Sequence, residues 1–338
     1  MRENTRKIGT GLSLVTAVAT LVVGLILQAA PADAGTSGEN RVGTRWSGAI
    51  NTRSVSAVNA AYWSQYANVQ SLSTDWLGGS LIGCLPGISS ASSNAATLSA
   101  LNYVRSLAGL APVTLSPTLN NGAQAAALMM SANGALSHSP SSSWKCYTPT
   151  GAAAAGRSNL ALAYPSIKAG QIVDLYMDDP GANNVAVGHR RWVLNPFTTQ
   201  VGTGSTDTAN ALTVIGPSSS ARPNPRYVGW PTAGYFPNAI EPDGRWSLSS
   251  GRRNISFAKA RVRVYQGTHR IPVRKYRVEN GYAMPTLVWQ MPAGFSKTGA
   301  YRVVVTHIKK FGSHKRLHIS SCSCEIGITQ IQTVSGDR

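Results

Sequence analysis

Apolar side chains in the first half of the chain recur at the three- and four-residue spacing of amphipathic helices. This spacing predicts helices over residues 55–72, 96–109 and 167–177. A further helix is expected to begin with Ser116 as its N-cap and Pro117 in its first position, where the missing N–H of proline costs nothing. It continues through an alanine-rich stretch, 123–132, whose small side chains permit close packing.

After residue 188 the pattern changes to short runs of apolar and β-branched residues. Runs at 192–194, 200–204 and 212–215 predict strands beside the helices, and therefore a small sheet with helices on both sides. A stretch rich in proline and serine follows, after which no helical stripe can be seen in the sequence. Short strands at close spacing there predict a β-sandwich, and they are expected at 261–265, 273–278, 286–289 and 301–307.

The first 34 residues have the layout of a secretory signal peptide. Basic residues precede an apolar stretch, and Ala32-Asp33-Ala34 is a typical cleavage site before Gly35. The alternative is an uncleaved membrane anchor, because the apolar stretch approaches the ~18 residues that a spanning helix needs. Cleavage would give a secreted, extracellular chain that is not transmembrane.

The chain exceeds the ~100–200 residues of one typical domain. We therefore divide its 338 residues into a signal peptide (1–34), an N-terminal extension with one helix (35–94), a central domain (95–217), a linker (218–226) and a β-sandwich domain (227–332). The expected fold class is α+β, with an α-β-α sandwich followed by an all-β sandwich.

Charge is strongly unbalanced, with 31 Lys and Arg against 13 Asp and Glu and a net charge of +18. Most of the excess lies in the C-terminal third, and it predicts attraction to polyanions. Outside a cell these are anionic surface polymers, lipid headgroups or stray nucleic acid, and no motif indicates specific nucleic acid recognition. A dense run of basic residues near the C-terminus predicts a polyanion patch on a hairpin tip; the alternative is a solubilising loop. The residues of this patch are Lys309, Lys310, Lys315 and Arg316.

The even number of cysteines, four, indicates disulfides in an exported chain. Cys84 and Cys146 are the ordinary pair, which would tie the N-terminal extension to the central domain. Cys322 and Cys324 would point to the same face of an extended strand and are too close for an unstrained bridge. They would either close a strained bridge or bind a soft metal.

Short motifs in a fixed order resemble the CAP superfamily, which comprises the cysteine-rich secretory proteins, antigen 5 and pathogenesis-related 1 proteins, called SCP-like in bacteria. The resemblance covers about residues 95–216. Its motifs are an N-x-x-R in the helix over 96–109, a first histidine, an S-N pair and a G-H pair; the residues are Asn102, Arg105, His138, Ser158, Asn159, Gly188 and His189.

The resemblance implies a cleft that gathers two histidines and two acidic residues, where some family members bind a divalent metal, typically zinc. His138 and His189 occupy the histidine positions and would be the metal ligands. Asp178 is expected as the second acidic residue, whereas Ser158 stands where the family usually has glutamate. The missing carboxylate weakens any metal site and removes the obvious general base.

Arg190 and Arg191 directly follow His189. Two nearby cations would favour the neutral imidazole that metals need. Alternatively, one arginine pairs with a carboxylate such as Asp174 or Asp179, and the other is solvated.

The favoured function is a binding protein that holds a small or lipidic ligand in the cleft and uses its basic β-domain to bind anionic surfaces. The alternative is a divalent-metal-dependent hydrolase of peptides or nucleic acid that uses the same histidines. A third possibility is an adhesive or structural wall protein. The sequence contains no G-x-S-x-G, no H-E-x-x-H and no phosphate-binding glycine-rich loop, so no catalytic residue is assigned.

Overall fold

The helices begin where the sequence provides capping side chains. In the computed structural model, which describes residues 43–279, 281–311 and the backbone of 320–332, Ser90 and Ser116 accept the backbone N–H groups of Ser93 and Leu119. Pro117 is the first residue of its helix, as predicted. The helices are α1 (Val55–Ala61, extended by a π turn and a 3-10 turn to Val69), α2 (Ala91–Leu107), α3 (Pro117–Asn133), α4 (Pro149–Ala155), α5 (Gln171–Asp178) and α6 (Gly188–Val193).

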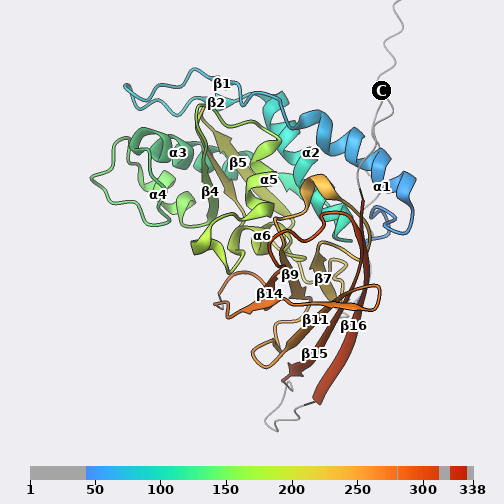
Figure 1. Cartoon of the computed structure of the whole chain (residues 1–338). Helices are drawn as coiled ribbons and strands as arrows, with labels where there is room; N and C mark the ends of the chain where they lie inside the picture. The colour runs from blue at the N-terminus through green and yellow to red at the C-terminus, as the bar shows by residue number, and fades with distance from the viewer. Residues whose placement is uncertain (1–42, 280, 312–319, 333–338) are drawn as a thin grey trace, which may run out of the picture. The chain divides into compact units, whose positions relative to one another are not determined.

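A four-stranded sheet lies between two layers of these helices (Figure 1). Its order is β3-β5-β6-β4, with β3 (Thr114–Leu115) parallel to β5 (Gln200–Ser205), and β6 (Ala209–Thr213) antiparallel to both β5 and β4 (Ser158–Leu162). One face is covered by small side chains of α3 and α4, and the other by larger side chains of α2 and α5. This is the predicted α-β-α sandwich.

Two glycines of β5 allow α3 to lie directly on the sheet. A Cβ atom on Gly202 would come within 2.3 Å of the carbonyl carbon of Leu119, and one on Gly204 within 2.1 Å of the backbone N of Gln124. No side chain fits into this space. The alanines of α3 extend the close contact along the helix, because Ala123, Ala126 and Ala127 are fully buried.

The prediction of a strand over 192–194 is wrong, because Trp192 and Val193 are the last residues of α6 and Leu194 is its C-cap. A short apolar run has no periodicity that separates a strand from a buried helical turn. The helix predicted over 167–177 begins only at Gln171. The strands predicted over 200–204 and 212–215 correspond to β5 and to the end of β6.

The C-terminal region consists of two facing sheets, as the predicted β-sandwich requires. A four-stranded sheet has the order β13-β14-β9-β7, and the other runs β12-β11-β15-β16-β8 with β10 paired to β15. The strands are β7 (Tyr227–Trp230), β8 (Gly234–Pro237), β9 (Arg245–Ser250), β10 (Ile255–Ser256), β11 (Arg261–Gln266), β12 (His269–Ile271), β13 (Arg274–Tyr276), β14 (Thr286–Gln290), β15 (Gly299–Lys310) and β16 (Ser320–Gln332).

Side chains from both sheets form one core. Trp246 of β9 and Trp289 of β14 pack against Val264 of β11 and against Tyr301 and Val303 of β15. The buried aromatic residues of β7 and β8, Trp230 and Phe236, instead belong to the core cluster of α1, α2 and α5. Contacts accordingly join residues 38–338 into one compact unit, and the domain boundaries given above stay a prediction.

The predicted Cys84–Cys146 disulfide is confirmed. It links the loop of a hairpin, formed by β1 (Trp76–Leu77) and β2 (Ile88–Ser89), to the segment that precedes α4. Cys322 and Cys324 lie on β16, but their side chains, the signal peptide, Lys315 and Arg316 are outside the part of the chain that the structure describes. None of the helices within the described ranges is long and apolar enough to cross a membrane.

Candidate functional site

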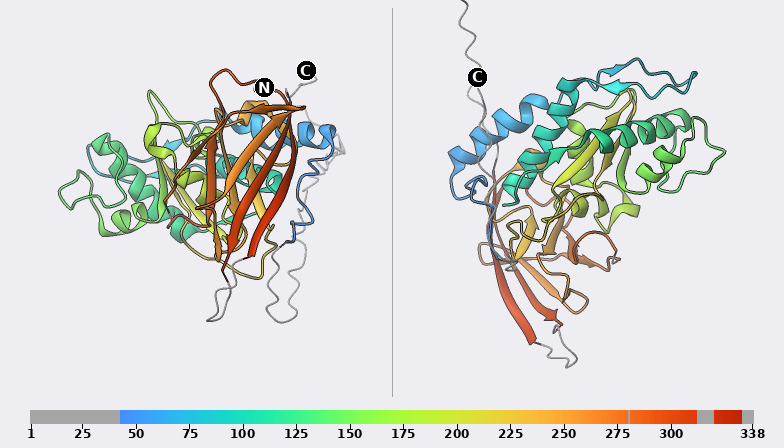
Figure 2. Two further views of the ribbon diagram at one scale, coloured as in Figure 1. Left: turned by 60° about the horizontal axis from the view of Figure 1, so that its bottom comes forward. Right: turned by 180° about the vertical axis from the view of Figure 1, so that it is seen from behind.

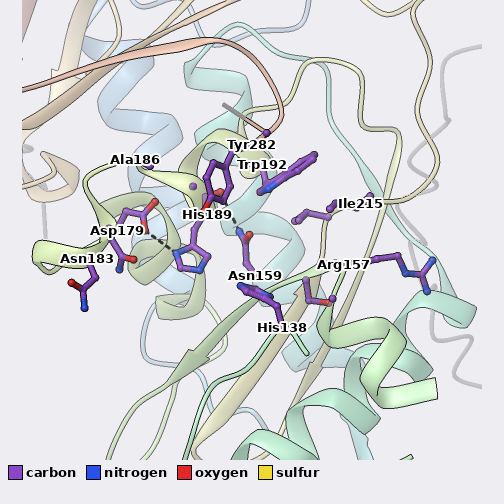
Figure 3. Close-up of a pocket in the computed structure, with 16 residues that line it drawn as sticks. His138, Arg157, Asn159, Asp179, Asn183, Ala186, His189, Trp192, Ile215 and Tyr282 are labelled. Atoms are coloured by element: carbon purple, nitrogen blue, oxygen red, sulfur yellow. Dashed lines mark hydrogen bonds and ion pairs between the residues drawn. The ribbon is translucent and has the colours of Figure 1, made fainter. Parts of the chain in front are cut away.

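A pocket of about 310 Å³ opens where the end of α4, the start of β4 and helix α6 meet (Figure 3). Its lining combines two imidazoles and several amides with a few apolar side chains. The residues that carry the argument below are His138, Ser158, Asn159, Asp179, His189, Trp192 and Tyr282. The two histidines therefore lie in one hollow, although 50 positions separate them in the sequence.

His189 is held by a buried carboxylate. Its Nδ1 lies 2.8 Å from Oδ1 of Asp179, whose side chain is only 1% exposed, against 24% for His189. The second oxygen of Asp179 accepts the backbone N–H of Arg190 at 3.3 Å. Asp179 is the C-cap of α5 in a left-handed conformation (φ 52°), which turns the chain toward α6. The carboxylate thus fixes both the ring of His189 and the start of its helix.

His138 is held by a main-chain carbonyl instead. It lies in the loop that follows α3, and its Nδ1 is 3.0 Å from the carbonyl oxygen of Ala155 at the end of α4. Because a carbonyl only accepts, Nδ1 carries a proton, and in the neutral ring Nε2 is then the acceptor. His138 is exposed, whereas His189 is half-buried.

The structure places the two remaining predicted cleft residues differently. Ser158 lines the pocket but is buried, and its hydroxyl donates to the carbonyl of Ala154 at 2.7 Å and lies 2.9 Å from the hydroxyl of Thr213. Asp178 does not line the pocket; Asp179 does. The helical periodicity of α5 cannot identify the correct aspartate, since the left-handed C-cap breaks it between the two residues.

The comparisons with known proteins agree with this architecture. The family model of the cysteine-rich secretory protein (CAP) family matches residues 98–215. Residues 98–215 are a CAP domain. No curated protein matches the chain. CAP-family proteins are generally extracellular.

Asn102 and Arg105 act as scaffold residues of the CAP domain and do not line the pocket. The side chain of Asn102 bonds both the N–H and the carbonyl of Val113, at 2.8 and 3.0 Å. The guanidinium of Arg105, 1% exposed, donates to the carbonyls of Ala111, Val193 and Asn195. Burial lowers its pKa to about 9, with a smaller contribution from the charge of Arg222. Arg105 thereby fixes the end of α6, the helix that carries His189.

Asn159 also supports His189, because its amide donates to the backbone carbonyl of His189 at 3.1 Å. Beneath the imidazole lies the buried ring of Tyr176, 5.5 Å away between centroids. The hydroxyl of Tyr176 donates to Oδ1 of Asn210 at 2.8 Å and lies 3.1 Å from the carbonyl of Asn159. The ring of His189 is thus supported by β4, α5 and β6 together.

The alternative expectation for Arg190 and Arg191, one ion-paired and the other solvated, is wrong: among the described residues neither guanidinium forms an ion pair, and both are buried. Arg190 donates to the carbonyls of Met177, Asp178 and Arg245 and to the hydroxyl of Ser247. Burial lowers its pKa to about 10, while the negative charges of Asp179 and Asp178 oppose this shift. The charged guanidinium therefore joins α5 of the CAP domain to β9 of the β-rich region.

Arg191 joins the CAP domain to the loop between β13 and β14. Its guanidinium donates to the carbonyls of Glu279 and Met284, at 3.0 and 2.9 Å, and lies 5.3 Å from the ring centroid of Tyr282. Tyr282 in turn borders the pocket and covers Gly188, where a Cβ atom would be 3.0 Å from the tyrosine ring. The β-rich region thus completes a pocket of the CAP domain.

Sequence reasoning missed Asp179, Trp192 and Tyr282. The G-H motif marks Trp192 by proximity, since it follows His189 by three residues and so lies one helical turn away. The sequence signal for Asp179 is its position directly before Pro180-Gly181, a turn signal that ends α5. For Tyr282 no local signal exists, because its position depends on how the two halves of the chain pack.

The two imidazoles meet one requirement of the metal site that the family implies and lack another. Both Nδ1 atoms are engaged by oxygen acceptors, which is the arrangement that orients metal-binding histidines through Nε2. However, the described residues contain no group of three or more His, Cys, Asp or Glu side chains arranged to hold a metal. Two imidazoles are fewer than the three protein ligands of a typical catalytic zinc site, so the described residues do not by themselves complete the metal site that the family implies.

Proposed function

We propose that the chain is a secreted binding protein whose CAP pocket holds a small ligand between His138 and His189. The observation that carries this proposal is the pair of imidazoles whose Nδ1 atoms are engaged while no hydrogen bond among the described residues occupies either Nε2. The volume of about 310 Å³ is at the lower end of the ~300–1,000 Å³ of small-molecule sites. The two Nε2 atoms, held in place as hydrogen-bond acceptors in a pocket of this size, suit a small molecule that donates hydrogen bonds.

The lining favours a small polar ligand over a lipid tail. Asn159, Asn183 and Asn184 add amide groups near the histidines. The larger apolar side chains of the lining are Trp192, Ile215 and Tyr282. Aromatic side chains with a polar tip offer an apolar face to a ligand ring and still tolerate water at the rim. A long alkyl chain would need a longer apolar groove than this lining supplies.

The proposal for the β-rich region is that it binds an anionic surface polymer or lipid. Lys309 and Lys310 lie at the end of β15. Lys315 and Arg316 are outside the described residues, so the hairpin-tip patch stays a prediction. The net charge of +18 supports the attraction.

One observation favours the alternative of a hydrolase. The buried Asp179 carboxylate beside His189 resembles the orienting partner of a general base, which leaves Nε2 of His189 able to take a proton. A divalent ion bound by His138 and His189 would polarise a substrate carbonyl or phosphoryl group. The proposal of binding without catalysis rests on the engaged Ser158 hydroxyl and on the incomplete ligand set among the described residues.

Zinc titration tests whether the two imidazoles act as one site. We expect the mature protein to bind one Zn²⁺ weakly, and the His138→Ala/His189→Ala variant to bind it at least about tenfold more weakly, since the double substitution removes both proposed ligands. A His269→Ala/His307→Ala variant removes two exposed histidines of the β-rich region and is the matched control. Calorimetry measures both.

Equal zinc affinity of the wild type and the His138→Ala/His189→Ala variant would refute the two-imidazole site. The same two proteins, incubated with a peptide and a nucleic acid substrate with and without zinc, distinguish binding from catalysis. Turnover that is lost in the double variant and kept in the control would establish the hydrolase and overturn the proposal of a non-catalytic protein.

Export is tested by the mass of the protein recovered outside the cell. We expect a chain that begins at Gly35, because the Ala32-Asp33-Ala34 sequence places cleavage after Ala34. N-terminal sequencing checks the first residue. Recovery of an intact N-terminus in the membrane fraction would instead support the uncleaved anchor.

A further inference from the structure

The outer face of the larger C-terminal sheet carries a set of arginines that the fold does not use. In β11 the sequence alternates Arg261, Val262, Arg263, Val264. Val264 is fully buried and Val262 packs against the same core, so Arg261 and Arg263 project from the opposite side of the strand. The left view of Figure 2 shows the orange and red strands of this sheet running across the front, with no helix of the described chain over them.

Neighbouring strands add cations to this side. Tyr265 of β11 is opposite Arg302 of β15 and Arg270 of β12 in the strand register, and directly opposite residues share a face. The Arg302 guanidinium lies over the Tyr265 ring, 4.3 Å from its centroid. Further along β15, Lys309 follows the buried Ile308 and is opposite Ser256. We call this set the basic sheet face: Arg261, Arg263, Arg270, Arg302 and Lys309.

The cations of the basic sheet face have no internal role that the described structure shows. Within that part of the chain none of the five donates a side-chain hydrogen bond or forms an ion pair, apart from the ring contact of Arg302; the ion pairs found there involve only His189 and Lys297 as cations. By contrast, the guanidiniums of Arg105, Arg190 and Arg191 are buried and bonded to carbonyls. The chain therefore separates structural arginines from arginines that face solvent.

The arrangement fits a linear partner better than a membrane. Alternate residues of a strand are about 7 Å apart, so Arg261 and Arg263 form a row of like charges that repel each other unless an anion lies along them. Among the described side chains of β11, β12 and β15 no large apolar one is exposed, and so none of these would insert into a bilayer.

We propose that the basic sheet face binds a linear polymer of repeating phosphate groups. Arginine is suited to this role, because its planar guanidinium donates two parallel hydrogen bonds to one phosphate. The inference rests on the proposed function in that it names the partner of the β-rich region. It differs from that proposal in placing the contact on the sheet face, and not on the hairpin tip of Lys315 and Arg316.

The test uses the full mature chain and fluorescently labelled inorganic polyphosphate, with anisotropy measured from 50 to 300 mM salt. The Arg261→Gln/Arg263→Gln variant is expected to bind at least about tenfold more weakly at low salt, and to reduce the slope of log K against log salt by about two. An Arg53→Gln/Lys168→Gln variant, called the CAP-half variant, removes the same charge from outside the β-rich region. Its affinity for polyphosphate is expected to stay within about twofold of that of the wild type. Equal melting temperatures establish that all variants fold.

Four results would overturn the proposal in distinguishable ways. If a Lys315→Gln/Arg316→Gln variant loses binding and the β11 variant does not, the tip is the site, and the anionic anchoring of the proposed function survives. If the β11 and CAP-half variants lose equally, the attraction is only the net charge. If the wild type binds no polyphosphate, both proposals for this region fail. Vesicles of phosphatidylglycerol, which carry the same phosphates on a surface, are expected to compete poorly per phosphate; equal competition would indicate a membrane and refute the linear polymer.

Discussion

Replacing Arg190 by alanine is expected to lower the free energy of unfolding by roughly 3–5 kcal/mol. The guanidinium is fully buried and donates to carbonyls on both sides of the junction between α5 and β9. Its removal leaves the carbonyls of Met177 and Arg245 without this donor, and leaves Asp179 with one fewer nearby positive charge. Urea denaturation followed by tryptophan fluorescence measures the change.

Two further variants separate the hydrogen bonds of Arg190 from its charge. Arg190→Lys keeps the charge but lacks the planar fork, so we expect it to recover less than half of the lost stability. Arg157→Ala removes an exposed arginine that also lines the pocket and is expected to change stability by less than about 0.5 kcal/mol. A loss below about 1 kcal/mol for Arg190→Ala would mean that water or a rearranged side chain takes over its contacts, and that the junction does not depend on it.

The elements that could be predicted from the sequence are those set by local chemistry. The α3 helix begins where Ser116 and Pro117 predict it, because both residues act on the first turn alone. The strand β11 follows from alternation of basic and apolar residues, which requires only one buried face. The Cys84–Cys146 pair could be expected because an even number of cysteines in an exported chain indicates disulfides and this pair is the ordinary one.

What could not be predicted depends on packing between distant segments. From the sequence, one of Arg190 and Arg191 is expected to pair with a carboxylate and the other to be solvated, and only the approach of β9 and of the β13–β14 loop buries both. Tyr282 belongs to the pocket for the same reason. The choice between Asp178 and Asp179 depends on one left-handed residue at the end of α5, which helical periodicity does not show and only the following Pro180-Gly181 turn indicates.

The pocket therefore combines a part that belongs to the CAP domain and a part that does not. His138, Asn159 and His189 are held by hydrogen bonds within the CAP domain. Tyr282 is positioned from outside it, through Arg191. Ligand preference can thus change through the β13–β14 loop while the imidazoles stay fixed, which is why the family model, matching 98–215 only, cannot specify the ligand.

The Gly204→Ala substitution is expected to cost about 3 kcal/mol, the upper end for overpacking a well-packed core. The added Cβ would be 2.1 Å from the backbone N of Gln124 and 2.5 Å from the carbonyl carbon of Ala123, so no side-chain rotation relieves the overlap. Helix α3 must move away from β5, and the alanines along it are too short to refill the gap. The midpoint of urea denaturation measures the loss.

Gly83→Ala is the matched control for Gly204→Ala. Its Cβ would be no closer than 3.4 Å to any atom, and its backbone does not require glycine, so we expect stability to change by less than about 0.5 kcal/mol. Gly216→Ala lies between the two, because its nearest neighbour is the flexible end of Leu119 at 3.2 Å. If Gly204→Ala were as stable as these two, the α3 helix would not lie directly on β5, and the alanine-rich sequence of α3 would need another explanation.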